Sequence, residues 1–197
     1  MKFDITLLLP ELVQLAIILA LFLQSLAKPR PGESGAVMAA DTRWVPLAAA
    51  AGLALAALSL GASGRLFWEV YQIDGLSQFF KFAVAAGFAI AVLNASKQPT
   101  LAPDKRADYF MLLALSAFGL MLLSSAVELI TIYLALEISS YSLYALIPLR
   151  GKDPRAAEAG IKYILFGAAR SEERRVGKRV DLGGRRIIKK KKGGGGG

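Results

Sequence analysis

The sequence predicts an all-α protein, a polytopic membrane helix bundle with five spans and a truncated sixth. Hydrophobic residues make up 55% of the 197 positions, and the mean hydropathy of +0.48 is too high for a soluble domain of this length. The apolar residues fall into segments of about 20, the length that a helix needs to cross the hydrocarbon core. Basic residues gather in alternate connections between these segments. Together these observations predict a multi-pass protein embedded in the lipid bilayer.

The five predicted spans cover residues 7–26, 44–62, 76–95, 107–126 and 127–149. The first has no basic leader and no small-residue cleavage site, so we expect it to be a retained span rather than a signal peptide. Ala and Gly are frequent in the second and third spans, which favours close helix packing. A sixth segment begins near Ala156 and meets Arg170 after about 14 residues, which is too short to span.

Loop charges predict the orientation of the chain. Nine basic residues lie in the connections after the first, third and fifth spans: Lys28, Arg30, Arg43, Lys97, Lys105, Arg106, Arg150, Lys152 and Arg155. The opposite side has only Lys2 and Arg65. Because short cytoplasmic loops are enriched in Lys and Arg, we expect the N-terminus outside the cytoplasm.

The net charge of +9 does not by itself indicate a polyanionic partner. Residues 170–197 contain eleven basic and three acidic residues, so the first 169 residues are nearly neutral. We therefore expect no nucleic-acid partner for the apolar part of the chain. The chain has no Cys and no His, which excludes thiolate or imidazole metal sites and histidine acid-base chemistry. Any proton movement must use carboxylates and lysines.

Glu137 is the first candidate for a proton-transfer residue. It lies near the midpoint of the fifth predicted span, followed by Ser139, Ser140, Tyr141 and Ser142. A charge at that depth costs on the order of 3 kcal/mol, so charges that persist there face a protein or water interior and mark ion or proton paths. The hydroxyl groups could hold a chain of water beside the carboxyl group. The alternative is a Glu137 that is buried and paired for packing or assembly.

Lys162 is the second candidate, six residues into the sixth segment. A short loop joins this segment to the fifth span, so the two are expected to form an antiparallel hairpin. By helix rise, Glu137 and Lys162 lie about 9 Å apart in depth, which predicts one polar path rather than a direct ion pair. The alternative for Lys162 is snorkelling to the membrane surface.

Three further charged residues lie near the ends of predicted spans. Glu128 is nine residues before Glu137, on the opposite helix face and about 13 Å away along the axis, and is a weaker proton-path candidate. Lys81, in the first turns of the third span, is expected to snorkel to the outer interface. Glu11, next to Pro10, is expected to make at most a polar contact at a kink and is assigned no role.

Residues 133–169, "YLALEISSYSLYALIPLRGKDPRAAEAGIKYILFGAA", closely resemble the fifth and sixth helices of the N subunit of bacterial NADH:quinone oxidoreductase, respiratory complex I. "LLLPELV" and "VYQIDGLSQFFKF" also resemble that subunit, so the resemblance covers residues 1–169. It implies that Glu137 and Lys162 belong to a proton-conducting polar axis. It also implies that NADH and quinone are used elsewhere in the complex, with no cofactor bound by this chain.

The same resemblance implies other membrane subunits of complex I as partners and the inner (plasma) membrane as location. Family members have about fourteen helices, so the resemblance implies that residues 1–169 form a truncated antiporter-like domain, inactive by itself. Two alternatives stay open. One is a cation/proton antiporter subunit, and the other is a small membrane adaptor with a polybasic tail.

The last 28 residues, "RSEERRVGKRVDLGGRRIIKKKKGGGGG", would place a block of charge inside the sixth helix. "RSEERRVGK" and "VDLGGRRII" resemble a translated sequencing adapter in two reading frames. Residues 170–197 are therefore predicted to be a non-native, disordered tail.

Overall fold

The computed structural model describes residues 5–26, 42–68, 70–96, 105–149, 158 and 160–166. The predicted tail and its boundary with the membrane domain lie outside these residues. The elements in chain order are η1 (Ile5–Leu8), α1 (Leu9–Leu26), α2 (Val45–Leu58), η2 (Ser59–Gly61), β1 (Gly64–Leu66), β2 (Tyr71–Ile73), α3 (Gly75–Ser96), α4 (Arg106–Ser125) and α5 (Leu129–Leu149). Residues 160–166 are also helical.

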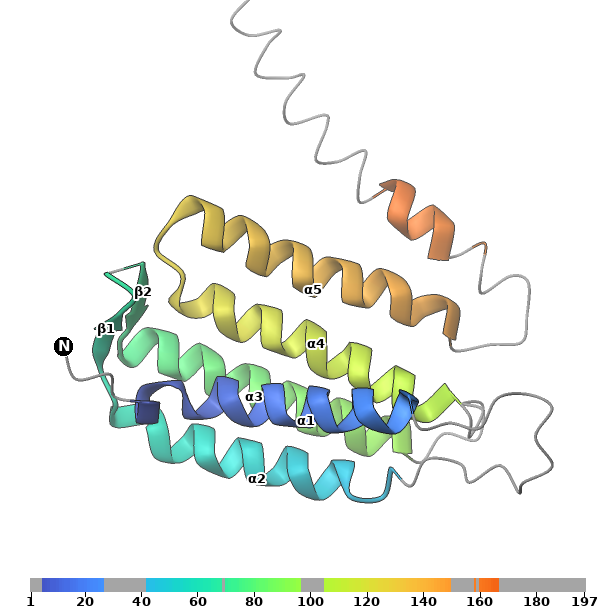
Figure 1. Cartoon of the computed structure of the whole chain (residues 1–197), viewed down its shortest axis with the longest axis horizontal. Helices are drawn as coiled ribbons and strands as arrows, with labels where there is room; N and C mark the ends of the chain where they lie inside the picture. The colour runs from blue at the N-terminus through green and yellow to red at the C-terminus, as the bar shows by residue number, and fades with distance from the viewer. Residues whose placement is uncertain are drawn as a thin grey trace, which may run out of the picture.

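The five long helices lie side by side as a bundle (Figure 1). α1 contacts both α4 and α2, α3 contacts α2 and α4, and α5 packs along the outer side of α4. The strands lie at one end of the bundle, called here the hairpin end, together with η1 and the turn between α4 and α5 (Figure 1). α2 and α4 begin at the opposite end, where Arg43, Lys105 and Arg106 are found.

Among the described residues, four helices are long and apolar enough to cross a membrane, namely α1, α3, α4 and α5. The segment Val45–Gly61, which joins α2 and η2, is apolar but shorter. The all-α membrane bundle is therefore confirmed. The count of five spans and the orientation of the N-terminus stay predictions.

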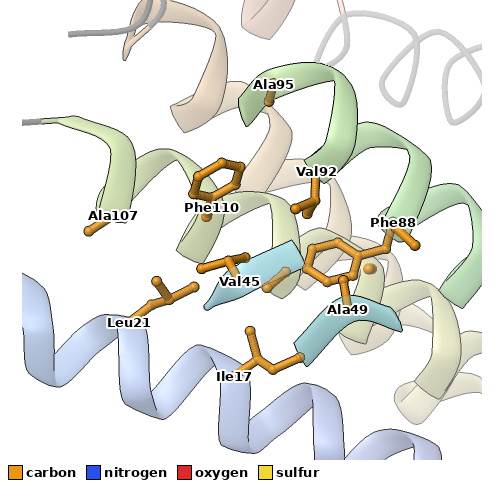
Figure 2. Packing of buried hydrophobic residues seen from close by; sticks show 12 residues of the cluster. Ile17, Leu21, Val45, Ala49, Phe88, Val92, Ala95, Ala107 and Phe110 are labelled. Carbon is orange, nitrogen blue, oxygen red and sulfur yellow. The ribbon is translucent and has the colours of Figure 1, made fainter. Parts of the chain in front are cut away.

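The main core lies among α1, α2, α3 and α4, at the end away from the hairpin (Figure 2). Small residues let the helices approach, and larger side chains fill the space between them. Its buried members are Ile17, Leu21, Val45, Ala49, Phe88, Ala89, Val92, Ala95, Ala107, Phe110, Ala114 and Ala117. α5 contributes no residue to this core, so its position depends on the contact with α4.

The strands form an antiparallel hairpin in which Gly64 pairs with Ile73 and Leu66 with Tyr71. Three-residue strands give too little alternation to be predicted from the sequence. Phe67 and Trp68 have φ of 53° and 54°, a left-handed conformation that is uncommon outside glycine. The hairpin is also joined to the α4–α5 turn, because Val127 N donates to Val70 O over 3.0 Å.

Asp74 precedes α3 and caps its first turn. Ser77 N donates to Asp74 Oδ1 over 2.7 Å, and Asp74 N donates to Ser77 Oγ over 2.9 Å, which is a capping box. The backbone hydrogen bond from Ser77 holds the pKa of Asp74 below its ordinary value. The cap therefore stabilises the fold above the unfolded-state pKa of Asp74, and this contribution is lost as pH falls through the lower folded-state value.

We expect Asp74→Ala to destabilise the chain at neutral pH and to lose its effect in acid. Unfolding in mixed micelles, followed by circular dichroism at several pH values, measures this difference. Ser96→Ala is the matched control, because the exposed Ser96 hydroxyl bonds only to Leu93 O in the described part of the chain. A deficit of Asp74→Ala that does not change with pH would contradict a charged cap.

Candidate functional site

Glu137 lies in the middle of α5, eight residues after its start and twelve before its end. Its side chain is half-buried. Tyr141 follows one helical turn later on α5. The predicted position of Glu137 near the middle of a long apolar helix thus agrees with the structure.

The helix face opposite Glu137, which carries Ala135 and Ser139, packs very closely on α4. Gly119 lies against the α5 backbone, so that a Cβ atom there would meet Ser139 N at 2.7 Å and Ala135 O at 2.9 Å. One turn away, the hydroxyl groups of Ser116 and Ser139 are 3.1 Å apart and hydrogen bonded. The buried Ser139 thus has a partner on α4, and the orientation of α5 is determined by backbone contact.

Lys162 lies on an exposed face of the helical residues 160–166, with its side chain 64% exposed. Its ammonium group is 2.6 Å from Glu158 Oε1, one turn earlier. The structure therefore pairs Lys162 with a neighbour in its own segment, and not with Glu137.

A row of tyrosine rings links α5 to the sixth segment. The ring of Tyr144 lies 6.1 Å from that of Tyr141 and 5.4 Å from that of Tyr163, both edge to face. Next to it, a Cβ atom on Gly160 would meet Pro148 at 2.8 Å. The predicted adjacency of the two segments is confirmed, and hydroxyl-bearing rings continue from Glu137 to the residue beside Lys162.

Glu128 lies in the turn before α5 and is exposed. Its carbonyl oxygen accepts a hydrogen bond of 3.0 Å from Ile132 N, in the first turn of the helix. The structure thus places Glu128 at the hairpin end of the bundle and Glu137 in its middle.

The prediction for Lys81 was wrong. Instead of snorkelling, Lys81 is fully buried, and its Nζ lies 2.5 Å from Oε1 of Glu11, whose side chain is 4% exposed. The expectation that Glu11 makes a polar contact was correct, but sequence reasoning did not identify its partner. The available signal was the opposite charge of the two residues at the same predicted end of two spans.

Tyr71 completes this buried pair, donating from Oη to Glu11 Oε1 over 2.6 Å. Its ring also lies 5.1 Å from Lys81 Nζ, within reach of a cation–π contact. Burial raises the pKa of the Tyr71 hydroxyl above its ordinary value, and the Glu11 charge adds to the shift. Tyr71 therefore stays protonated and remains a hydrogen-bond donor.

The described residues include no group of three or more His, Cys, Asp or Glu side chains that could hold a metal ion. The charged and hydroxyl side chains described above can exchange protons, and the candidate chemistry of the site is therefore proton transfer.

Comparisons with known proteins match this chain to respiratory membrane subunits. A family model described as "NADH:quinone oxidoreductase/Mrp antiporter, TM" matches residues 126–172, which include α5. NADH-quinone oxidoreductase subunit N 2 of Solidesulfovibrio magneticus is 55% identical over 162 residues, covering 82% of this chain and 33% of the relative. The protein of the same name from Opitutus terrae is 36% identical over 165 residues, covering 82% and 33%. Subunit N of Desulfovibrio desulfuricans is 34% identical over 167 residues, covering 84% and 32%.

The chain spans about one third of the length of these curated relatives. The residues that the family model matches include Glu137. Over the part that it spans, the chain belongs to the family of N subunits of NADH-quinone oxidoreductase.

Proposed function

We propose that residues 1–169 are part of a proton-translocating, antiporter-like membrane subunit of NADH:quinone oxidoreductase. In this proposal NADH and quinone react elsewhere in the complex, and other membrane subunits and the lipid of the inner membrane surround this chain. The chain crosses the membrane five times and enters it a sixth time, with its N-terminus outside the cytoplasm. Residues 170–197 are not part of the functional protein, and the chain alone does not pump.

The observation that carries the proposal is the half-buried Glu137 in the middle of a helix that is long enough to span a membrane. Intramembrane carboxyl groups of this kind mark ion or proton paths. Tyr141, Tyr144 and Tyr163 extend hydroxyl groups from Glu137 toward the sixth segment. We assign proton binding to Glu137 and Lys162, with Glu128 as a weaker third member at the membrane surface.

A chimeric subunit tests the role of Glu137. Residues 1–169 of this chain replace the aligned third of the Solidesulfovibrio magneticus subunit in its complex, and proton uptake is measured in vesicles energised with NADH. We expect Glu137→Gln to lose most of the uptake while the complex still assembles, because an amide cannot bind and release the proton. Glu137→Asp, which keeps the carboxyl group, should recover part of it.

Two results would contradict this role. Unchanged uptake with Glu137→Gln would remove the residue from the path, and equal loss with Glu137→Asp would indicate a packing role. Assembly is checked in parallel by the amount of chimera in the purified complex.

The second candidate is a cation/proton antiporter subunit, because the description of the matching family names both kinds of protein. Replacing sodium by choline in the same vesicles separates the two functions. A signal that requires sodium favours the antiporter, and one that does not favours proton translocation. The third possibility, an adaptor with a polybasic tail, depends on residues 170–197, and resequencing the gene beyond codon 169 tests whether they are encoded.

A further inference from the structure

A second group of buried polar side chains lies at the hairpin end of the bundle, away from Glu137. It is called here the hairpin-end cluster and consists of Glu11, Tyr71, Gln78, Lys81 and Ser125. Four elements contribute to it, namely α1, β2, α3 and α4. Each member is less than 5% exposed, so lipid does not reach the cluster directly.

The cluster has more hydrogen-bonding capacity than its members use. Oε1 of Glu11 is occupied by both Tyr71 and Lys81. In contrast, Glu11 Oε2, Gln78 Nε2 and Ser125 Oγ have no hydrogen-bond partner among the described residues. The Lys81 ammonium group lies close to Glu11, but its orientation does not meet the angle of a hydrogen bond.

A buried ion pair that serves only as a fixed link is stable when hydrogen bonds satisfy the remaining lone pairs and protons of both charged groups. The hairpin-end cluster does not meet this condition, because a carboxylate oxygen, an amide nitrogen and a hydroxyl of its members remain without a hydrogen-bond partner among the described residues. Such groups are the usual partners of buried water, which makes two to four hydrogen bonds. The cluster therefore has the donors and acceptors to hold water.

A cavity of about 410 Å³ adjoins the cluster and gives it room for water. Water occupies about 30 Å³ per molecule, so the volume is sufficient. Glu11 and Tyr71 are lining residues, and Thr131 of α5 adds a hydroxyl group. The remaining lining residues are apolar: Leu8, Leu12, Leu15, Phe67, Val70, Phe118 and Leu122. Most of the cavity lining is thus apolar, and polar partners for water lie only beside Glu11, Tyr71 and Thr131.

We propose that Glu11, Tyr71 and Lys81 form a second proton-binding site, which holds water, at the hairpin end of the bundle. A proton delivered by cavity water adds to the Glu11 carboxylate, giving the neutral acid and opening the contact to Lys81. Lys81 keeps its own proton and stays over the Tyr71 ring, so the net charge of the pair changes from zero to +1. Loss of the proton from Glu11 to water restores the ion pair.

Three described elements each contribute one titratable group to the contacts of the hairpin-end cluster. These groups are Glu11 from α1, Tyr71 from β2 and Lys81 from α3. α4 contributes Ser125 and α5 contributes Thr131, neither of which titrates. Because Glu137 belongs to a different part of α5, the proposal does not depend on its assigned function.

Infrared difference spectroscopy of the full chain in lipid nanodiscs tests the proposal. Acidification from neutral pH should produce the carbonyl band of a protonated carboxyl group together with difference bands of bound water. We expect Glu11→Gln to lose one component of the carbonyl band together with the bands of bound water, and Glu137→Gln to retain that component, because it removes a different carboxyl group. Tyr71→Phe should shift the frequency of the carbonyl band, because the acid loses a hydrogen-bonding neighbour.

Three results would overturn the proposal. The first is a carbonyl band that has the same components in Glu11→Gln as in the unsubstituted chain. The second is a Glu11 that stays ionised down to the pH at which helical circular dichroism is lost, which would make the pair a fixed link. The third is a carbonyl band without bands of bound water. Since Tyr71→Phe removes one hydroxyl and no charge, it keeps the test available if variants of the charged residues fold poorly.

Discussion

Replacing Lys81 with methionine is expected to destabilise the folded chain by about 3–5 kcal/mol, the usual loss when one partner of a buried ion pair is removed. Methionine fills most of the volume of the lysine stem, so the loss comes from charge and not from a cavity. The Glu11 carboxylate would stay buried with only the Tyr71 hydroxyl as a donor among the described residues. Unfolding by denaturing detergent in mixed micelles, followed by circular dichroism, measures the difference.

The double variant Glu11→Gln/Lys81→Met is the matched control for this prediction. It removes both charges. Replacing both members of a buried ion pair with uncharged residues often changes the stability little. We therefore expect the double variant to recover most of the stability that Lys81→Met loses. A double variant as unstable as the sum of the two single variants would show that the charges do not interact.

The second large effect is expected at Gly119, where α4 and α5 are in backbone contact. The added methyl group of Gly119→Ala would lie 2.7 Å from Ser139 N and 2.9 Å from Ala135 O. Backbone cannot turn aside as a flexible side chain can, so α5 must move outward. We expect a net loss of about 1–3 kcal/mol, the range for overpacking a well-packed site, measured by the same detergent unfolding.

Gly87→Ala provides a control of opposite sign. A Cβ atom at Gly87 would meet no atom within 4 Å, and alanine favours the helix over glycine by about 1 kcal/mol. Gly87→Ala is therefore expected to leave stability unchanged or raise it. If Gly119→Ala were equally harmless, the close approach of α4 and α5 would be wrong.

The sequence predicted the long helices closely because hydrophobic length is a local property. α3 and α4 begin and end within one residue of the predicted segments, and α5 begins two residues later than predicted. The shorter Val45–Gly61 segment is the exception. There the apolar stretch predicted a span, but the helix changes to a 3-10 turn at Ser59, whose hydroxyl bonds back to Ala56 O.

The candidate site was only partly predictable, for a physical reason. The depth of Glu137 follows from counting residues along one helix, and the structure agrees with the count. The partner of Lys81 depends on which helices touch and on which faces, and a single sequence does not contain this information. A lysine near a span end can equally well snorkel or pair, and here a carboxyl group and an aromatic ring lie within its reach.

The pairing of Glu11 with Lys81 has a consequence for how the protein is made. α1 leaves the ribosome before α3, so Glu11 reaches the membrane when its partner has not yet been synthesised. A charge inside the bilayer is costly without a partner, and α1 also packs extensively on α4. We therefore expect α1 to enter the bilayer without its ion-pair partner and without its main packing neighbour. Both are supplied when α3 and α4 have been synthesised.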